Sequence, residues 1–172
     1  MSIQNVNVTG ELTDSSGASD ALLIAPSPYD GPVARRLVRA VLADLGGRYG
    51  GAGDETPVDP TEFVPPAGSF LVAWRDGTPV GCGGWRSHGA GIAELKRMYT
   101  APEARGTGVA RAMLTAIERD ARAAGRARVI LECGARQPEA LRLYERCGYT
   151  RIENYGFYAG SADCRSYGRD LD

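Results

Sequence analysis

The stretch that decides the fold runs from Glu94 to Ala110 and reads ELKRMYTAPEARGTGVA. A strand is predicted to end near Thr100, Pro102 forces a turn, and the segment Arg105-Gly106-Thr107-Gly108 leads directly into a helix. Glycine allows positive φ angles and lets another molecule approach the backbone closely. The first N–H groups of a helix have no partner in the chain and lie at the positive end of the helix dipole. The segment therefore predicts a binding site for a phosphate or pyrophosphate group.

Two better-known phosphate motifs do not fit this turn. The dinucleotide pattern GxGxxG is incomplete because Arg111 stands where its third glycine belongs. The pattern GxxxxGK[ST] fails because Glu103 occupies its first glycine position and no lysine follows Gly108. On the glycines alone, a tight strand-to-helix turn without a ligand remains the alternative.

Hydrophobic spacing and turn residues predict the elements around this turn. We expect strands at 21–25, 69–74, 78–85, 92–100, 129–133, 149–154 and roughly 162–171, and helices at 32–45, 108–124 and 138–147. Asp30 is placed to cap the first helix and Gly46-Gly47 to end it. Residues 46–67 are too rich in Gly and Pro for regular structure, and so long a connection is uncommon unless it binds something or covers a site.

Composition limits the class of protein. The 172 residues suit one domain, predicted at 20–172 after a polar N-terminal leader at 1–19. A net charge of -1 gives no basic field for nucleic acid. Four cysteines without a CxxC pair, and a single histidine at His88, make a metal site improbable. The sequence has no signal-peptide pattern and no apolar run of about 20 residues, so we expect a cytoplasmic protein without a membrane partner. A homodimer is compatible with the sequence.

A second informative stretch, QPEALRLYERCGY at 137–149, predicts a short helix that ends at a glycine. With the first stretch it forms a pair of motifs that resembles the GNAT superfamily of N-acetyltransferases. The motifs are RxxGxA (Arg105, Gly108, Ala110) and A-x-x-x-Y-E-x-x-G-Y (Ala140, Tyr144, Glu145, Gly148, Tyr149). The resemblance covers roughly 20–172, and two motifs at the right separation are far more specific than either alone.

The resemblance implies an α/β (α+β) fold. A mixed central sheet of six to seven strands would be flanked by helices on both faces, with the central strands splayed around the cofactor. It also implies transfer of the acetyl group of acetyl-CoA to a primary amine of a small molecule, an amino acid or a peptide, by direct attack in a ternary complex. A catalytically inactive, coenzyme A-binding regulatory or structural protein on the same fold is the alternative.

The resemblance assigns the cofactor to two segments and two further residues. Backbone amides of the turn would hold the pyrophosphate, and the edge of the preceding strand would pair with the pantetheine arm. These segments are Arg105, Gly106, Thr107, Gly108, Val109, Ala110 and Arg111 in the turn, and Met98, Tyr99 and Thr100 in the strand. Gln137 stands where the family usually has an asparagine that contacts the pantetheine, and Tyr144 lies on the helix that follows.

Two residues are predicted to carry the chemistry. Tyr144 matches the family's general acid, which protonates the departing thiolate; a core tyrosine is the alternative. Glu94 is the candidate base, with burial expected to raise its pKa toward neutrality. The alternative for Glu94 is an ion pair with Arg97 or another arginine. His88 is a weaker rival base.

The substrate pocket is expected where the strands at 92–100 and 129–133 splay apart. Its walls would come from the 46–67 loop and the chain after Tyr149. Arg48 and Tyr49 are placed to meet a carboxylate, with Glu94 beside the amine. The loop acids, Asp54, Glu55, Asp59 and Glu62, are placed to meet a cationic amine, or are simply solvated. The sequence does not decide among the three classes of amine.

Overall fold

A computed structural model describes residues 21–172; the leader predicted at 1–19 lies outside this range. The strands are β1 (Leu22–Pro26), β2 (Gly68–Arg75), β3 (Thr78–Ser87), β4 (Ile92–Thr100), β5 (Arg128–Gly134), β6 (Thr150–Arg151) and β7 (Cys164–Asp170). The helices are α1 (Pro32–Tyr49), α2 (Val109–Ala123) and α3 (Pro138–Arg146), with two 3-10 turns at Pro60–Phe63 and Pro102–Ala104. Within this range no helix combines the length and apolar character that crossing a membrane requires.

All seven strands form one sheet in the order β1-β2-β3-β4-β5-β7-β6. Every neighbouring pair is antiparallel except β4 and β5, which run parallel. The helix α2 lies between β4 and β5 in the chain and makes the crossover that a parallel pair requires. The predicted mixed sheet of six to seven strands is therefore confirmed.

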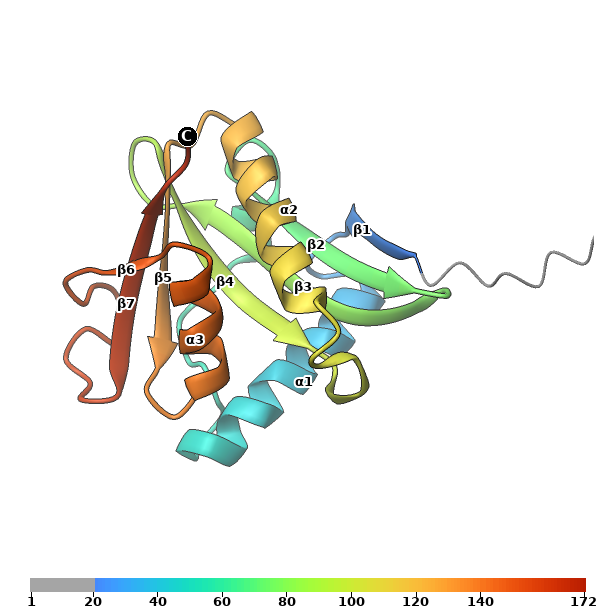
Figure 1. The fold of residues 1–172 in the computed structure, drawn as a ribbon, viewed down its shortest axis with the longest axis horizontal. Helices are drawn as coiled ribbons and strands as arrows, with labels where there is room; N and C mark the ends of the chain where they lie inside the picture. The colour runs from blue at the N-terminus through green and yellow to red at the C-terminus, as the bar shows by residue number, and fades with distance from the viewer. Residues whose placement is uncertain (1–20) are drawn as a thin grey trace, which may run out of the picture.

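Helices cover both faces of the sheet (Figure 1). On one face α2 and α3 bury Met113, Leu114, Ile117 and Tyr144 against the sheet. On the other face α1 packs against β3 and β4, beside a smaller cluster that includes Phe63 and Phe70. The helical spacing seen in the sequence therefore marks the faces that are buried.

The two central strands separate halfway along their length. Pairing between β4 and β5 begins at Ile92↔Arg128 and ends at Glu94↔Ile130, although both strands continue. Beyond that point β4 is irregular, since Arg97 has a positive φ of 57° and the register with β3 shifts there. This bulge re-aims the strand and leaves the β5 side of β4 without a β-ladder partner. The splay predicted between 92–100 and 129–133 is confirmed, and Figure 1 shows β4 and β5 diverging.

Four local features differ from the sequence prediction. The helix α1 continues through Gly46-Gly47 to Tyr49, and Gly50, with a φ of 81°, ends it. Its N-cap is Gly31, without a side-chain cap from Asp30. The 46–67 connection also holds regular structure, because Asp59 and Glu62 form a capping box around the 3-10 turn. Strand β6 is two residues long instead of spanning 149–154.

Candidate active site

A cavity of about 330 Å³ lies where β4 and β5 diverge. Its sheet wall consists of Leu95, Lys96, Arg97 and Met98 from β4, and Leu131, Glu132, Cys133 and Gly134 from β5. Other walls come from α1 and the loop after it (Val41, Leu45, Tyr49, Gly53, Asp54, Thr56), from Gln137 and Tyr144, and from Tyr158, Ser161, Asp163 and Cys164 near the C-terminus. The cavity lies where the sequence analysis expects the pocket, with the expected walls.

The glycine turn at the start of α2 has the geometry of an anion site. Gly106 and Gly108 have φ angles of 75° and 87°, which side chains other than glycine rarely adopt. A Cβ built on either glycine would meet no atom within 4 Å, so the backbone here is open to approach. The first intrahelical bond closes from Ala112 to Gly108, and the first turn carries no acidic residue. The N–H groups of 109–111 therefore face outward at the positive helix end, which fits a phosphate group.

Side chains fix the orientation of this turn relative to β4. The hydroxyl of Thr107 donates to the carbonyl of Ala104 at 2.7 Å. Arg105 folds back along the strand, and its Nε donates to the carbonyl of Thr100 at 3.1 Å. The end of β4 and the predicted pyrophosphate turn are therefore held together in one rigid corner.

Tyr144 and Gln137 both line the cavity from α3 and its N-cap. Tyr144 is 6% exposed, and its ring packs edge-on against Tyr149 with the centroids 5.8 Å apart. Burial, assisted by nearby cysteines, raises the pKa of the Tyr144 hydroxyl well above the usual range. The phenol therefore keeps its proton at neutral pH, as a hydrogen-bond donor to the cavity must.

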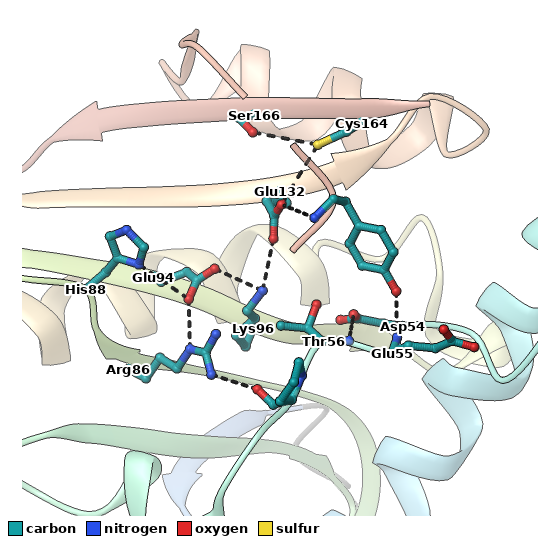
Figure 2. A network of polar contacts seen from close by, with 12 residues as sticks. Asp54, Glu55, Thr56, Arg86, His88, Glu94, Lys96, Glu132, Cys164 and Ser166 are labelled. Atoms are coloured by element: carbon teal, nitrogen blue, oxygen red, sulfur yellow. Dashed lines mark hydrogen bonds and ion pairs between the residues drawn. The ribbon is translucent and has the colours of Figure 1, made fainter. Parts of the chain in front are cut away.

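The pKa of Glu94 is shifted in the direction opposite to the one expected from the sequence. Burial alone would raise its pKa, but ion pairs with Lys96 and Arg86 outweigh that effect and lower the pKa below its usual value. Its Oε1 lies 2.9 Å from Lys96 Nζ and its Oε2 lies 2.8 Å from Arg86 Nε (Figure 2). The expectation of a raised pKa is therefore wrong, and the ion-pair alternative is right, with Arg86 in place of Arg97. Glu94 is not among the residues that line the cavity.

Glu132, which the sequence analysis missed, is the carboxylate that lines the cavity from the sheet. Its Oε2 lies 3.3 Å from Lys96 Nζ, and its Oε1 accepts the Tyr158 N–H at 3.3 Å. Figure 2 shows Glu132 reaching from β5 to the same lysine that pairs with Glu94. The alternation of side chains along a strand could have revealed Glu132. It is the one acid among the apolar residues at 129–133, and it shares a sheet face with Ile130, so an acid was to be expected on that face.

The predicted substrate residues divide between the cavity and its surroundings. Tyr49 lines the cavity, whereas Arg48 pairs with Asp44 at 3.3 Å and with Glu139 at 2.5 Å and does not. Among the loop acids only Asp54 reaches the cavity, where it pairs with Arg97. Asp59 caps the 3-10 turn, Glu62 pairs with Arg86, and Glu55 contributes its backbone N–H to Tyr158. His88 lies 3.8 Å from Glu94, outside the cavity.

The lowered pKa of Glu94 predicts a pH-dependent contribution to stability. A carboxyl whose folded-state pKa is lowered stabilises the fold at neutral pH, and this contribution is lost as the pH falls below the usual value of 4.5. The E94Q variant should therefore be less stable than the wild type at pH 7 by about 2 kcal/mol, the size of hydrogen bonds to a charged group. The difference should narrow on acidification, as urea unfolding at several pH values would show.

Glu153→Gln is the matched control, because Glu153 is exposed. This variant should match the wild type at every pH. A stability difference for E94Q that stays constant from pH 7 into the acid range would contradict the ion-pair assignment.

The sequence matches a known protein family and two known proteins. The acetyltransferase (GNAT) family model matches residues 38–149. An IAA acetyltransferase of Azospirillum brasilense is 42% identical over 90 residues, which are 52% of this chain and 59% of that protein. The chain thus spans less than two thirds of that relative's length. YjgM of Escherichia coli K12, named as an uncharacterized N-acetyltransferase, is 32% identical over 146 residues, or 78% of this chain and 85% of that protein.

Solved structures share the fold. The protein yncA of Salmonella typhimurium, whose structure was determined with acetyl-CoA, superposes with a TM-score of 0.67 at 17% identity, covering 88% of this chain and 95% of that one. At this identity the likeness concerns the fold alone. The family itself is shown by the family model, which matches most of the chain, and by the relative in E. coli. On these grounds the chain belongs to the GNAT acetyltransferase family.

Proposed function

We propose that the protein transfers the acetyl group of acetyl-CoA to a primary amine, by direct attack with both substrates bound. The observation that carries this proposal is the shared cavity. The β5 side of β4, the carboxylate of Glu132 and the protonated phenol of Tyr144 all border the same 330 Å³ space. The N-acetyltransferase name of the E. coli relative supports an amine as the acceptor.

The donor would be held by backbone groups of two segments. The amides from Arg105 to Arg111 suit its pyrophosphate, and β4 from Met98 to Thr100 suits its pantetheine arm, with Gln137 beside the arm. Acetyl-CoA is a substrate here, and it supplies the thioester whose C–S bond breaks. The amine nitrogen bonds to the acetyl carbon; of the two protons that the ammonium loses, one ends on the thiol and the other in solvent.

Glu132, in place of Glu94, is proposed as the base that accepts the first of these protons. Both oxygens of Glu94 are within 2.9 Å of a cation, so Glu94 is held ionised by strong partners and has little tendency to bind a proton. Glu132 has longer contacts, at 3.3 Å, and it borders the cavity. Glu94 then acts as a positioning residue, because it holds Lys96 beside Glu132.

Tyr144 is proposed to protonate or hydrogen-bond the departing sulfur. Its raised pKa means that the phenol carries its proton at the pH of catalysis. It borders the cavity from α3, on the side of the sheet opposite α1. Negative charge that develops on the sulfur would therefore meet a donor that is already in place.

One substitution tests the function together with its donor site. The wild type should release free thiol from acetyl-CoA when a primary amine is added. Gly108→Glu should weaken acetyl-CoA binding about 30-fold, or about 2 kcal/mol, because a carboxylate at the helix start repels a pyrophosphate. Isothermal calorimetry measures the affinity, and a thiol reagent measures the turnover.

Gly89→Glu is the matched control. Gly89 also has a positive φ, of 76°, and open space around it, but it lies in the β3–β4 turn. It should carry the same backbone strain and keep wild-type affinity. Unchanged affinity in a folded G108E variant would refute the phosphate site, and acetyl-CoA binding without thiol release for any amine would favour the inactive, coenzyme A-binding alternative.

A further inference from the structure

We propose that the acceptor is a compact primary amine without a carboxylate, and that Tyr49 and Tyr158 restrict it to this class. The proposal rests on the proposed function and chooses among the amines that the family fold allows. Three features of the cavity support it: two lining tyrosines whose hydroxyls are hydrogen-bonded to other segments, a limited volume, and a polar wall in which both cations among the described residues are paired.

Tyr49 lines the cavity from the end of α1. Its hydroxyl accepts the backbone N–H of Arg136 at 2.9 Å, and so joins α1 to the segment that connects β5 and α3. The ring lies so close to Gly134 that a Cβ there would collide with the hydroxyl. Arg48 and Arg136 reinforce this junction, since each guanidinium donates to the other's backbone carbonyl at 3.1 Å.

Tyr158 lines the cavity from the segment between β6 and β7. Its hydroxyl accepts the N–H of Glu55 at 2.6 Å, and its own N–H donates to Glu132 Oε1 at 3.3 Å. The residue therefore spans from the proposed base to the loop after α1. Figure 2 shows Glu55 on that loop, across the space from Glu132 on β5.

The cavity is small for two substrates. A volume of about 330 Å³ is at the lower end of the range for ligand pockets. Part of it must hold the acetyl group and the end of the pantetheine arm. Both tyrosines line the cavity, and their hydroxyls are held by hydrogen bonds to other segments. A peptide chain that follows the reacting amine would therefore collide with a tyrosine ring or break one of these hydrogen bonds.

The charges of the polar wall favour an ammonium group and disfavour a carboxylate. Lys96 and Glu132, which line the cavity, belong to one connected network with Glu62, Arg86 and Glu94 behind them. The network holds three carboxylates and two cations, so an incoming ammonium group would balance its excess negative charge. The other cation of the wall, Arg97, is already paired with Asp54. A carboxylate on the substrate would therefore enter a buried site in which every cation has a partner, and burying an uncompensated charge is unfavourable.

Three amines that differ in one property each test the proposal. Propylamine is compact, β-alanine adds a carboxylate to a chain of similar length, and trialanine amide adds bulk without a carboxylate. With kcat/KM calculated on total amine, since the polar wall is proposed to favour the ammonium form, propylamine should exceed each of the others by about tenfold or more, the factor that 1.4 kcal/mol produces. Y158A should raise the ratio of trialanine amide to propylamine about tenfold, because it removes one wall.

Phe157→Ala is the matched control for Y158A. Phe157 neighbours Tyr158 and is 55% exposed, and it does not line the cavity. F157A should keep the wild-type ratio, and calorimetry with acetyl-CoA shows whether both variants are folded. The wild-type panel decides the proposal even if Y158A does not fold. A wild type that prefers β-alanine or trialanine amide would overturn the substrate class and leave the function intact, whereas no thiol release with any amine would overturn both.

Discussion

Replacing Glu132 by glutamine is expected to lower the acetyl-transfer rate about 10³-fold, within the range for a lost general base. An alkyl amine attacks only when it is neutral, yet at pH 7 most of it is protonated. Glu132 is the carboxylate of the sheet wall that borders the cavity, and glutamine keeps its size while removing its basicity. Stopped-flow thiol release at saturating acetyl-CoA measures the rate. The loss should shrink as the pH rises, because more amine is then neutral without help.

Glu94→Gln is the control for this experiment, because it makes the same chemical change one contact away in the same network. Glu94 does not line the cavity and its pKa is lowered, so E94Q should reduce the rate far less than E132Q. A large loss in E94Q with wild-type turnover in E132Q would return the base to Glu94. Equal losses in both would show that the network acts as a unit through Lys96.

The position of the cavity was expected from the resemblance to the GNAT superfamily, and that resemblance rests on local signals. The strand, the turn and the helix start between Glu94 and Ala110 are adjacent in the chain, and glycine and proline restrict that backbone directly. The cavity follows from topology, since a parallel β4–β5 pair with α2 as its crossover brings the two expected segments together. These inferences required no knowledge of side-chain partners.

The electrostatics of the site were less predictable because they depend on residues that are distant in the chain. Lys96, together with Arg86 directly opposite Glu94 in the β3–β4 register, reverses the effect that burial alone would have on the pKa of Glu94. Lys96 was within reach of the sequence analysis, because residues two apart in a strand share a face. Arg97 or another arginine was the expected partner; Arg97 lies at the bulge, where its φ is positive, and pairs with Asp54 instead.

The end of α1 was also hard to predict from the sequence, because a contact with a distant segment accompanies it. Gly46-Gly47 is a common helix stop, and the sequence analysis placed the boundary there. In the structure the helix continues to Tyr49, whose hydroxyl bonds across to Arg136. A contact to a segment 87 residues away in the chain therefore accompanies the extra helical turn, and tertiary contacts override local propensity of this kind.

Tyr144→Phe is expected to lower the chemical rate about 10²-fold while the affinity for acetyl-CoA stays nearly constant. The substitution keeps the buried ring and its packing against Tyr149, and it removes only the hydroxyl that would meet the departing sulfur. Because the pKa of Tyr144 is raised far above the assay range, its protonation does not change with pH, and the loss should be similar from pH 7 to pH 9. Single-turnover kinetics and calorimetry separate the rate from the affinity.

The neighbouring Tyr149→Phe makes the same change outside the cavity. The Tyr149 hydroxyl donates to Glu118 at 2.8 Å, so its loss should reduce stability by about 1 kcal/mol and leave the rate unchanged. If Tyr144 were only a core residue, Y144F would resemble Y149F, with a small stability loss and normal turnover. A folded Y144F enzyme with the wild-type rate would therefore refute the general-acid assignment. A rate that falls in Y144F alone would place proton donation to the sulfur at this hydroxyl.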